Sequence, residues 1–348
     1  MRAGRTGAIT RRWLARRPVV ADAAESGRGV GVTNSPRLRV GVVGVGYLGR
    51  FHARIFAAMP DVELIGVADV DPAAARAAAS EHGCRAFEQA SDLIGQVDAV
   101  SVVVPTSAHK EVAEPFLRAG VHMMLEKPVA ASVSDAKEIV EMADRAGVVL
   151  QIGHLERFNA GIMRLAEDVK NPRFIEAHRL GTFVERATDV DVVTDLMIHD
   201  IDIVLSLVRS DISHIDAMGL PVLTEHVDIA NARIEFANGA VANVTASRVS
   251  NKKFRRIRVF AHDSYHALNF IDQQIDVVRK GAPGAGSRFP SIETERIEVE
   301  PHKPLDAELA DFVATVRRGG TPVVTGHDGL AALSVATLVK EKIHSCLT

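Results

Sequence analysis

The chain of 348 residues is long enough for two domains, each with its own core. Its net charge of -3 gives no basic surface field, which argues against nucleic acid as a partner. No apolar run approaches the roughly 20 residues that cross a bilayer, so no membrane partner is expected. The cysteines, Cys84 and Cys346, have no histidine or cysteine at metal-ligand spacing, which predicts a reducing, cytoplasmic compartment and no metal site.

Residues 1–36 are rich in arginine and small residues and show no apolar periodicity. This composition predicts a disordered extension outside the fold. An organellar transit peptide is the alternative, because such peptides are rich in arginine and poor in acidic residues, whereas a secretory signal would need an apolar stretch.

A β-branched run at residues 39–43 predicts a buried parallel strand and leads directly into Gly44-x-Gly46-x-x-Gly49. The first glycine permits a tight turn, the second lets the backbone approach a pyrophosphate, and the third lets the next helix pack closely. That helix, expected over residues 47–59, offers its N-terminal amides to the phosphates. The motif predicts dinucleotide binding if a second strand and an acidic residue follow.

Both follow. A second strand over residues 63–68 ends at Asp69, a carboxylate placed to accept the ribose hydroxyls of an adenosine and to repel a 2′-phosphate. NAD is therefore the expected cofactor. Helix capping is the alternative role for Asp69, but Asp71 is the better candidate for the cap of the helix that begins at Pro72.

Strands and helices continue to alternate up to residue 153. The expected helices cover residues 72–82, 108–119 and 133–146, and the expected strands cover residues 98–104, 121–125 and 148–152. The pattern predicts a doubly wound parallel sheet, a Rossmann NAD-binding domain over residues 37–153, with ligands at the carboxyl ends of the strands.

Polar residues follow two of these strand ends. Thr106 and His109 come after one, and Glu126-Lys127-Pro128 comes after the next. Pro128 restricts the turn and should direct Lys127 over the nicotinamide, although a lysine at such a position is often an ordinary solvated one. The cofactor-binding candidates are Gly44, Gly46, Tyr47, Leu48, Gly49, Asp69, Thr106, His109, Glu126 and Lys127.

The pattern changes after Gly153. A helix is expected to open at His154, and alternating segments at residues 174–178, 230–236, 240–245, 255–260 and 274–278 predict a large, mostly antiparallel sheet, with a hairpin at Asn238-Gly239. Residues 281–290 predict a flexible loop, and residues 306–317 and 329–343 predict helices. Residues 154–348 should therefore form a second α/β domain for substrate binding and oligomerisation, with C-terminal helices that pack back on the first.

One helix of this second domain carries ionisable residues on one face. Asp195, His199 and Asp202 are spaced i, i+4 and i+7 in an otherwise apolar helix, with Thr194 as the expected N-cap. Such groups are costly to bury without a purpose. A surface pair that merely supports the helix is the alternative.

Together, the glycine motif, Asp69, Glu126-Lys127-Pro128 and Asp195-x-x-x-His199 resemble the Gfo/Idh/MocA family of sugar oxidoreductases, from about Leu38 to the C-terminus. The resemblance implies a Rossmann domain followed by an α/β domain whose open sheet mediates homodimer or homotetramer contacts. It also implies that Lys127, Asp195 and His199 are the catalytic residues, with His199 as the acid/base group.

A narrower likeness, in residues 153–159 and 188–193, is to members that oxidise nucleotide sugars, notably UDP-N-acetylglucosamine 3-dehydrogenases. It implies a UDP-hexosamine substrate oxidised at C3, lipid A or surface-polysaccharide (lipopolysaccharide) biosynthesis, and a downstream aminotransferase as partner. His154, Arg157 and Asn159, with Lys127 and His199, are the substrate-binding candidates, and the guanidinium of Arg157 suits a diphosphate. A free polyol or inositol dehydrogenase and a non-catalytic NAD or sugar sensor are the alternatives.

Overall fold

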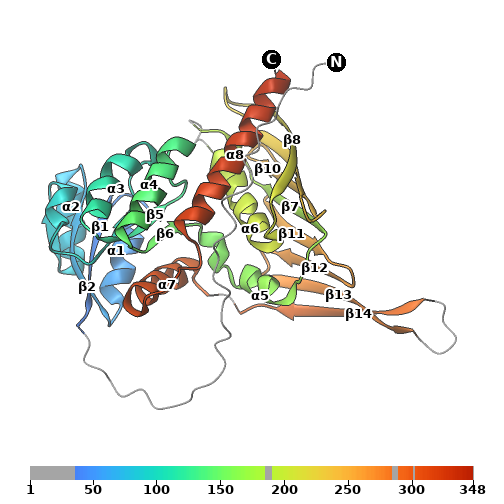
Figure 1. Ribbon diagram of the computed structural model, residues 1–348, viewed down its shortest axis with the longest axis horizontal. Coiled ribbons are helices and arrows are strands. Elements are labelled where there is room, and N and C mark those ends of the chain that lie inside the picture. Colours follow the sequence, from blue (N-terminus) through green and yellow to red (C-terminus); the bar gives the residue numbers. More distant parts are fainter. Residues whose placement is uncertain (1–35, 185–189, 284–288, 301, 348) are drawn as a thin grey trace, which may run out of the picture.

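The computed structural model describes residues 36–184, 190–283, 289–300 and 302–347. Within them, two sheets stand side by side and the C-terminal helices return between and beneath them (Figure 1). The extension was predicted over residues 1–36, of which residues 1–35 lie outside the described residues. Pro36 already contacts the fold, because its carbonyl accepts a hydrogen bond of 3.1 Å from Arg317.

The first sheet has six parallel strands in the order β3-β2-β1-β4-β5-β6. Its strands are β1 (Leu38–Val43), β2 (Val62–Ala68), β3 (Arg85–Phe87), β4 (Ala99–Val102), β5 (His122–Glu126) and β6 (Leu150–Gly153). The strand order reverses between β1 and β4, and in such sheets the crevice at the reversal point binds the ligand. The carboxyl ends of β1, β4 and β5 therefore define where a dinucleotide belongs.

The helices around this sheet are α1 (Gly49–Ala58), α2 (Pro72–His82), α3 (His109–Arg118) and α4 (Val133–Ala146), with short 3-10 turns at η1 (Ala90–Leu93) and η2 (Thr106–Ala108). Both α2 and α4 have the predicted bounds because each carries its own signals. The Asp71 and Ser132 side chains accept hydrogen bonds from first-turn amides, and left-handed Gly83 and Gly147 end the helices.

The second sheet has eight strands in the order β14-β13-β12-β11-β7-β10-β9-β8. All neighbouring strands are antiparallel except β7 and β10, which run parallel. Its strands are β7 (Phe174–Leu180), β8 (Ile212–Leu220), β9 (Ile229–Phe236), β10 (Val241–Ser247), β11 (Phe254–Phe260), β12 (Ser264–Asn269), β13 (Gln274–Pro283) and β14 (Pro290–Glu298). The predicted α/β combination of a Rossmann sheet and a large, mostly antiparallel sheet is confirmed.

Helices cover only one face of the second sheet (Figure 1). They are α5 (Ala160–Asp168), the π-helical turn η4 (Val193–Met197), α6 (Ile198–Val208) and α8 (Gly326–Leu347), which packs against β8. The short 3-10 turn η3 (Leu155–Phe158) precedes α5. The opposite face carries no helix in the part of the chain that the structure describes.

Two C-terminal helices tie the two sheets together. In α7 (Pro304–Arg318), Leu309 and Phe312 pack in one core with Val40 and Phe56 of the first sheet and its helix. The longer α8 (Gly326–Leu347) lies against both α4 and α6. No helix among the described residues combines the length and apolarity needed to cross a bilayer.

Three local predictions are wrong. The helix expected at His154 is a 3-10 turn, and α5 begins only at Ala160. Thr194 is not the N-cap. The capping side chain is that of Asp191, which accepts a hydrogen bond of 2.8 Å from the backbone amide of Thr194. Strand β13 continues to Pro283, into the expected loop at residues 281–290, of which residues 284–288 lie outside the described residues.

Candidate active site

The loop that contains Gly44, Gly46 and Gly49 has room for a side chain at Gly46 and none at Gly44 or Gly49. A Cβ atom on Gly44, whose φ is 86°, would come within 2.4 Å of the Val103 carbonyl oxygen, and one on Gly49 within 1.8 Å of the Gly44 oxygen. A Cβ on Gly46 would meet nothing within 4 Å. Gly44 and Gly49 thus let α1 start directly against β1, and the backbone at Gly46 borders open space, where the glycine motif predicts the pyrophosphate.

Asp69 lies at the end of β2 and holds the glycine loop. Its carboxylate accepts hydrogen bonds from the Val45 amide at 2.7 Å and the Asp71 amide at 2.9 Å. Each carboxylate oxygen has more than one acceptor site, so the group can still accept from a ribose. Tyr47 and Leu48 are 60% and 46% exposed, and their roles in cofactor binding stay predictions. Asp71 caps α2 as predicted.

His109 has a structural role that the sequence did not predict. Its buried ring places Nδ1 3.0 Å from the Pro128 oxygen and Nε2 3.0 Å from the Val104 oxygen. Because both ring nitrogens face backbone carbonyls, His109 ties the end of β4 to the turn after β5, where the Lys127-Pro128 peptide is cis. It supports the turn in this way, and its role in cofactor binding stays a prediction. Thr106 lies half-buried in η2, and its role in cofactor binding stays a prediction.

Glu126 is held under this turn by a histidine of α1. Its Oε1 lies 3.3 Å from Nε2 of His52, whose Nδ1 lies 2.8 Å from the Ser101 hydroxyl. Burial alone would raise the pKa of Glu126, but the contact with His52 and the charge of Lys127 outweigh it and lower the pKa. Glu126 is therefore a carboxylate whose charge offsets that of Lys127.

Lys127 joins the two sheets. Its Nζ donates to the backbone oxygen of Asp195 at 3.0 Å and lies 3.8 Å from the Asp195 carboxylate. Burial lowers the pKa of Lys127, although the charges of Asp195 and Glu126 oppose that effect. The structure thus brings two of the three predicted catalytic residues together.

His199 follows Asp195 by one helical turn, in α6. The sequence predicted that these two side chains share one helical face, but in the structure they are not bonded to each other. Asp195 belongs to the π-helical turn, whose i→i+5 bonding differs from the α-helical spacing that the prediction assumed. No hydrogen bond or ion pair joins Asp195 to His199 in the described residues, and Nδ1 of His199 is buried without a partner. Burial, followed by the charges of Lys127 and Arg179, holds the pKa of His199 well below its usual range.

The predicted substrate-binding residues lie in the segment between the sheets. His154 is buried, with its ring centroid 6.3 Å from that of His199, and neither of its ring nitrogens has a partner within the described chain. Asn159 caps α5 by accepting a hydrogen bond of 2.9 Å from the Gly161 amide. Arg157 pairs with the buried carboxylate of Asp202 at 3.3 Å, and a diphosphate would have to compete with that pair.

Sequence reasoning missed a group of charged residues beside this segment. Arg179 of β7 donates to Asp200 of α6 at 2.8 and 3.0 Å and to Glu156 of η3 at 2.7 Å. Arg255 of β11 lies 3.6 Å from the same Glu156 carboxylate. The alternation of residues along the strands could have identified both. Each arginine lies two residues from a buried apolar residue, Ala177 or Ile257, and so points to the same face of its strand.

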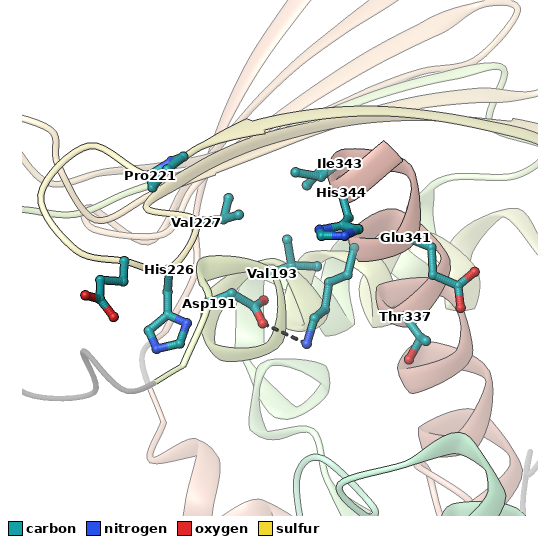
Figure 2. A pocket seen from close by; sticks show the side chains of 11 residues that line it. Asp191, Val193, Pro221, His226, Val227, Thr337, Glu341, Ile343 and His344 are labelled. Atoms are coloured by element: carbon teal, nitrogen blue, oxygen red, sulfur yellow. Dashed lines mark ion pairs between the residues drawn. The ribbon is translucent and has the colours of Figure 1, made fainter. Parts of the chain in front are cut away.

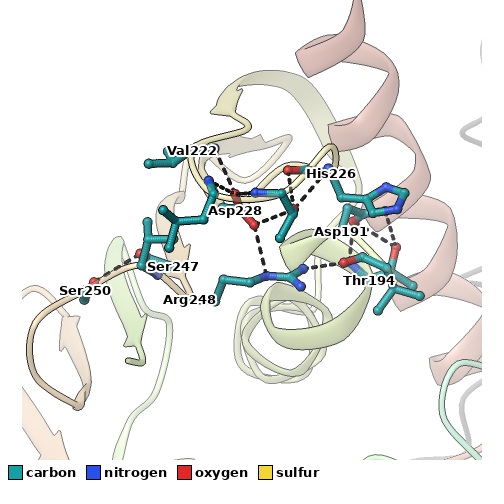
Figure 3. A network of polar contacts seen from close by, with 12 residues as sticks. Asp191, Thr194, Val222, His226, Asp228, Ser247, Arg248 and Ser250 are labelled. Atoms are coloured by element: carbon teal, nitrogen blue, oxygen red, sulfur yellow. Dashed lines mark hydrogen bonds and ion pairs between the residues drawn. The ribbon is translucent and has the colours of Figure 1, made fainter. Parts of the chain in front are cut away.

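A polar network around Asp228 and Arg248 holds the segment that precedes η4 and α6 (Figure 3). The buried carboxylate of Asp228 accepts from the amides of Val222, Leu223 and Thr224 at 2.7 to 2.8 Å, and these donors outweigh its burial and lower its pKa to about 2. Asp228 also lies 3.6 Å from Nε of Arg248, whose guanidinium donates to the Val190 carbonyl. The network fixes the backbone just ahead of Asp195.

A pocket of about 550 Å³ lies next to this network, between α8 and the connection from β8 to β9 (Figure 2). Asp191 lines it and pairs with Lys340 at 2.8 Å. Neither Lys127 nor His199 is among its lining residues. No group of three or more potential metal ligands is present there or elsewhere in the described ranges.

Hydride transfer to a dinucleotide requires a cradle for the cofactor and groups that handle one proton, and this site provides both. The fold and the site therefore define a nicotinamide-dependent oxidoreductase. Comparison with known families agrees. Residues 38–154 match the oxidoreductase family with an NAD-binding Rossmann fold, and residues 151–264 match the Gfo/Idh/MocA C-terminal domain. The chain belongs to the Gfo/Idh/MocA family of NAD-dependent oxidoreductases.

Among its relatives, UDP-N-acetylglucosamine 3-dehydrogenase of Acidithiobacillus ferrooxidans is 37% identical over 89% of this chain and 98% of its own length. The crystal structure of that protein superimposes with a TM-score of 0.84, covering 90% of this chain and all of the other. Inositol 2-dehydrogenase of Rhizobium meliloti is 27% identical over 86% of this chain and 94% of its own.

Proposed function

We propose that this protein oxidises the C3 hydroxyl of UDP-N-acetylglucosamine, or of a closely related UDP-hexosamine, to a ketone with NAD. The observation that carries the proposal is that Lys127, which directly follows the carboxyl end of β5, is hydrogen-bonded to Asp195 just ahead of the helix of His199. The similarity to a UDP-N-acetylglucosamine 3-dehydrogenase over nearly the whole chain supports the choice of substrate.

The residues of the glycine loop fit NAD, because the space at Gly46 and the Asp69 carboxylate suit a pyrophosphate and a ribose without a 2′-phosphate. The chemistry that NAD supplies when bound is acceptance of a hydride from the carbinol carbon. Thr106 and Glu126, at the ends of neighbouring strands, would border the nicotinamide half.

His199 accepts the proton of the substrate hydroxyl in this mechanism. Its lowered pKa leaves the imidazole neutral at pH 7, which is the state that a base needs. Lys127 stabilises the developing alkoxide through a charge-assisted hydrogen bond, and Asp195 holds Lys127 in place. This assignment gives Asp195 a role on the lysine in place of the predicted role on the histidine.

Two rival functions remain distinguishable by assay. A free polyol or inositol dehydrogenase is favoured by the similarity to inositol 2-dehydrogenase, and would act on uncharged sugars. A non-catalytic sensor would have no need for Lys127 and His199 on facing elements, and no sugar would reduce NAD.

Partners follow from the same proposal. A downstream aminotransferase would consume the ketone in lipid A or surface-polysaccharide assembly, in the cytoplasm. A homodimer or homotetramer would form through the helix-free face of the second sheet. Exposed Met218 and Phe254 on its strands support this face. Light scattering of the purified protein measures the oligomeric state.

A screen of UDP-hexosamines and free polyols for NADH formation tests the function. A coupled aminotransferase should be included, because it removes ketone and draws an unfavourable equilibrium forward. His199→Asn should retain substrate binding and lower kcat by about 10²- to 10⁴-fold, the usual contribution of a general base. Lys127→Ala should cause a similar loss. Native turnover in the His199 variant would refute the mechanism, whereas activity on inositol alone would refute the substrate.

A further inference from the structure

Two arginines lie side by side on neighbouring strands of the second sheet. Arg255 of β11 and Arg179 of β7 are paired residues in the antiparallel register, so their side chains leave the sheet on the same face. That face carries α6, the helix of His199. Two like charges at this spacing repel each other unless an acidic group lies between them.

Glu156 is that group, but it serves the two arginines unequally. Its Oε1 lies 2.7 Å from Nη1 of Arg179 and 3.6 Å from Nη1 of Arg255. Arg179 also holds Asp200 with two hydrogen bonds and is buried. Arg179 is therefore fully engaged within the protein.

Arg255 has donors to spare. Its contact with Glu156 is longer than a hydrogen bond, and no other partner for its side chain exists among the described residues. Its side chain is 47% exposed. Burial and the charge of Arg179 lower the pKa of Arg255, so an anion placed beside it would relieve an unfavourable arrangement of charge.

Arg255 is linked to the helix of His199 through its strand partner, because Arg179 is hydrogen-bonded to Asp200, the residue after His199. The charge of Arg255 is among those that lower the pKa of His199, and Glu156 follows His154 by only two residues. Lys252 and Lys253, both exposed, precede it in the loop from β10. This rim of the site is consequently basic on its solvent side.

We propose that Arg255 binds a phosphate group of the sugar-nucleotide substrate and so selects charged sugars over free polyols. The proposal rests on the proposed function for the identity of the substrate, and it assigns to Arg255 the role that sequence reasoning gave to Arg157. The planar fork of an arginine donates two parallel hydrogen bonds to a phosphate, which a lysine cannot reproduce.

Titration calorimetry of UDP, with the protein saturated in NAD so that the dinucleotide site is filled, tests binding separately from turnover. Arg255→Gln should raise the Kd of UDP by about tenfold to a hundredfold, the loss of one charge-assisted hydrogen bond or pair. Arg255→Lys should recover part of the affinity. Arg145→Gln is the control, because Arg145 is exposed on α4 of the other domain and pairs with Glu141 of the same helix. This variant should leave the Kd within about twofold.

Kinetics provides the second measurement. Arg255→Gln should raise the KM for UDP-N-acetylglucosamine by a similar factor, with kcat changed by less than about threefold and the KM for NAD unchanged. The uncharged methyl glycoside of N-acetylglucosamine should react equally poorly with native protein and variant. Equal losses on charged and uncharged sugars, or an unchanged Kd for UDP, would overturn the proposal.

The two proposals fail differently. If UDP-N-acetylglucosamine is oxidised but its KM is indifferent to Arg255→Gln, the function stands and the role of Arg255 falls. If UDP binds through Arg255 but no sugar nucleotide is oxidised, Arg255 is still a phosphate-binding residue and the proposed reaction is wrong. Native protein that does not bind UDP refutes the role of Arg255 directly.

Discussion

Replacing Glu308 with glutamine should stabilise the protein at neutral pH, and the gain should grow with pH. Glu308 lies on α7, is 1% exposed, and has no hydrogen-bond partner for either carboxyl oxygen in the described chain. Burial, followed by the charges of Glu126, Asp311 and Asp202, raises the pKa of Glu308 well above its usual value. The folded protein therefore keeps a proton on this group at pH values where the unfolded chain has released it.

The sign and size follow from proton linkage. Because the folded pKa of Glu308 is the higher one, its contribution to stability is complete below the unfolded pKa and is lost as pH rises through the folded pKa. Over that window the free energy of unfolding falls by about 1.4 kcal/mol for each pH unit, starting near pH 4.5. Glutamine has nearly the same shape and no proton to lose, so the variant escapes this loss.

Thermal unfolding of native protein and Glu308→Gln at about pH 5, 6 and 7 measures the effect. Each kcal/mol should shift Tm by roughly 2–4 °C for domains of this size. Glu341→Gln, which removes an exposed glutamate from α8, is the control and should show no such trend. A difference in Tm that does not grow with pH, or a Glu308 variant that is less stable at pH 7, would refute the reasoning.

Three further predictions concern the site. Because burial and nearby cations lower the pKa of His199, kcat/KM should stay constant down to pH 6.5 and decline only below it; a decline that begins above pH 7 would contradict the assignment. Asp69→Ala should lower the ratio of the Kd for NADP to the Kd for NAD. If the native protein binds NADP more tightly than NAD, the predicted contact between the Asp69 carboxylate and the adenosine ribose is wrong. Arg248→Met should lower kcat by about tenfold with the KM for NAD unchanged, because the segment before Asp195 loses its anchor. Arg173→Met, which breaks an equivalent bond to the Asn238 carbonyl at the other end of the same strand pair, should leave kcat unchanged.

The elements predicted best from the sequence are those that carry their own boundaries. Helices α2 and α4 have a capping side chain at one end and a glycine at the other, and the hairpin at Asn238-Gly239 joins β9 and β10 as expected. Strands β8, β12 and β14 were missed, of which β8 and β14 lie at the two edges of the sheet and β12 lies inside it. Most residues of β14 are exposed, so it lacks the apolar alternation on which strand prediction depends.

The residues of the site also differ in how well the sequence predicts them. Lys127 and Asp195 were identified from short motifs, and the fold brings them into contact across a separation of 68 residues. The partners of Arg157 and Asn159 depend on tertiary packing, which residue type alone does not reveal. Helical spacing of i and i+4 predicted a contact between Asp195 and His199, but Asp195 lies in a π-helical turn and no bond joins the two side chains in the described residues.

The packing of α7 has a consequence for synthesis. Phe312 and Leu309 complete the core formed by β1 and α1, yet they lie about 156 residues beyond the last strand of the first sheet. At roughly 5–20 residues per second, the ribosome needs about 8–31 s to make that intervening chain. During this interval the newly made Rossmann sheet exposes the surface of Val40 and Phe56 that α7 later covers. A nascent chain stalled before residue 304 should therefore bind hydrophobic chaperones at this surface and release them once α7 has left the ribosome.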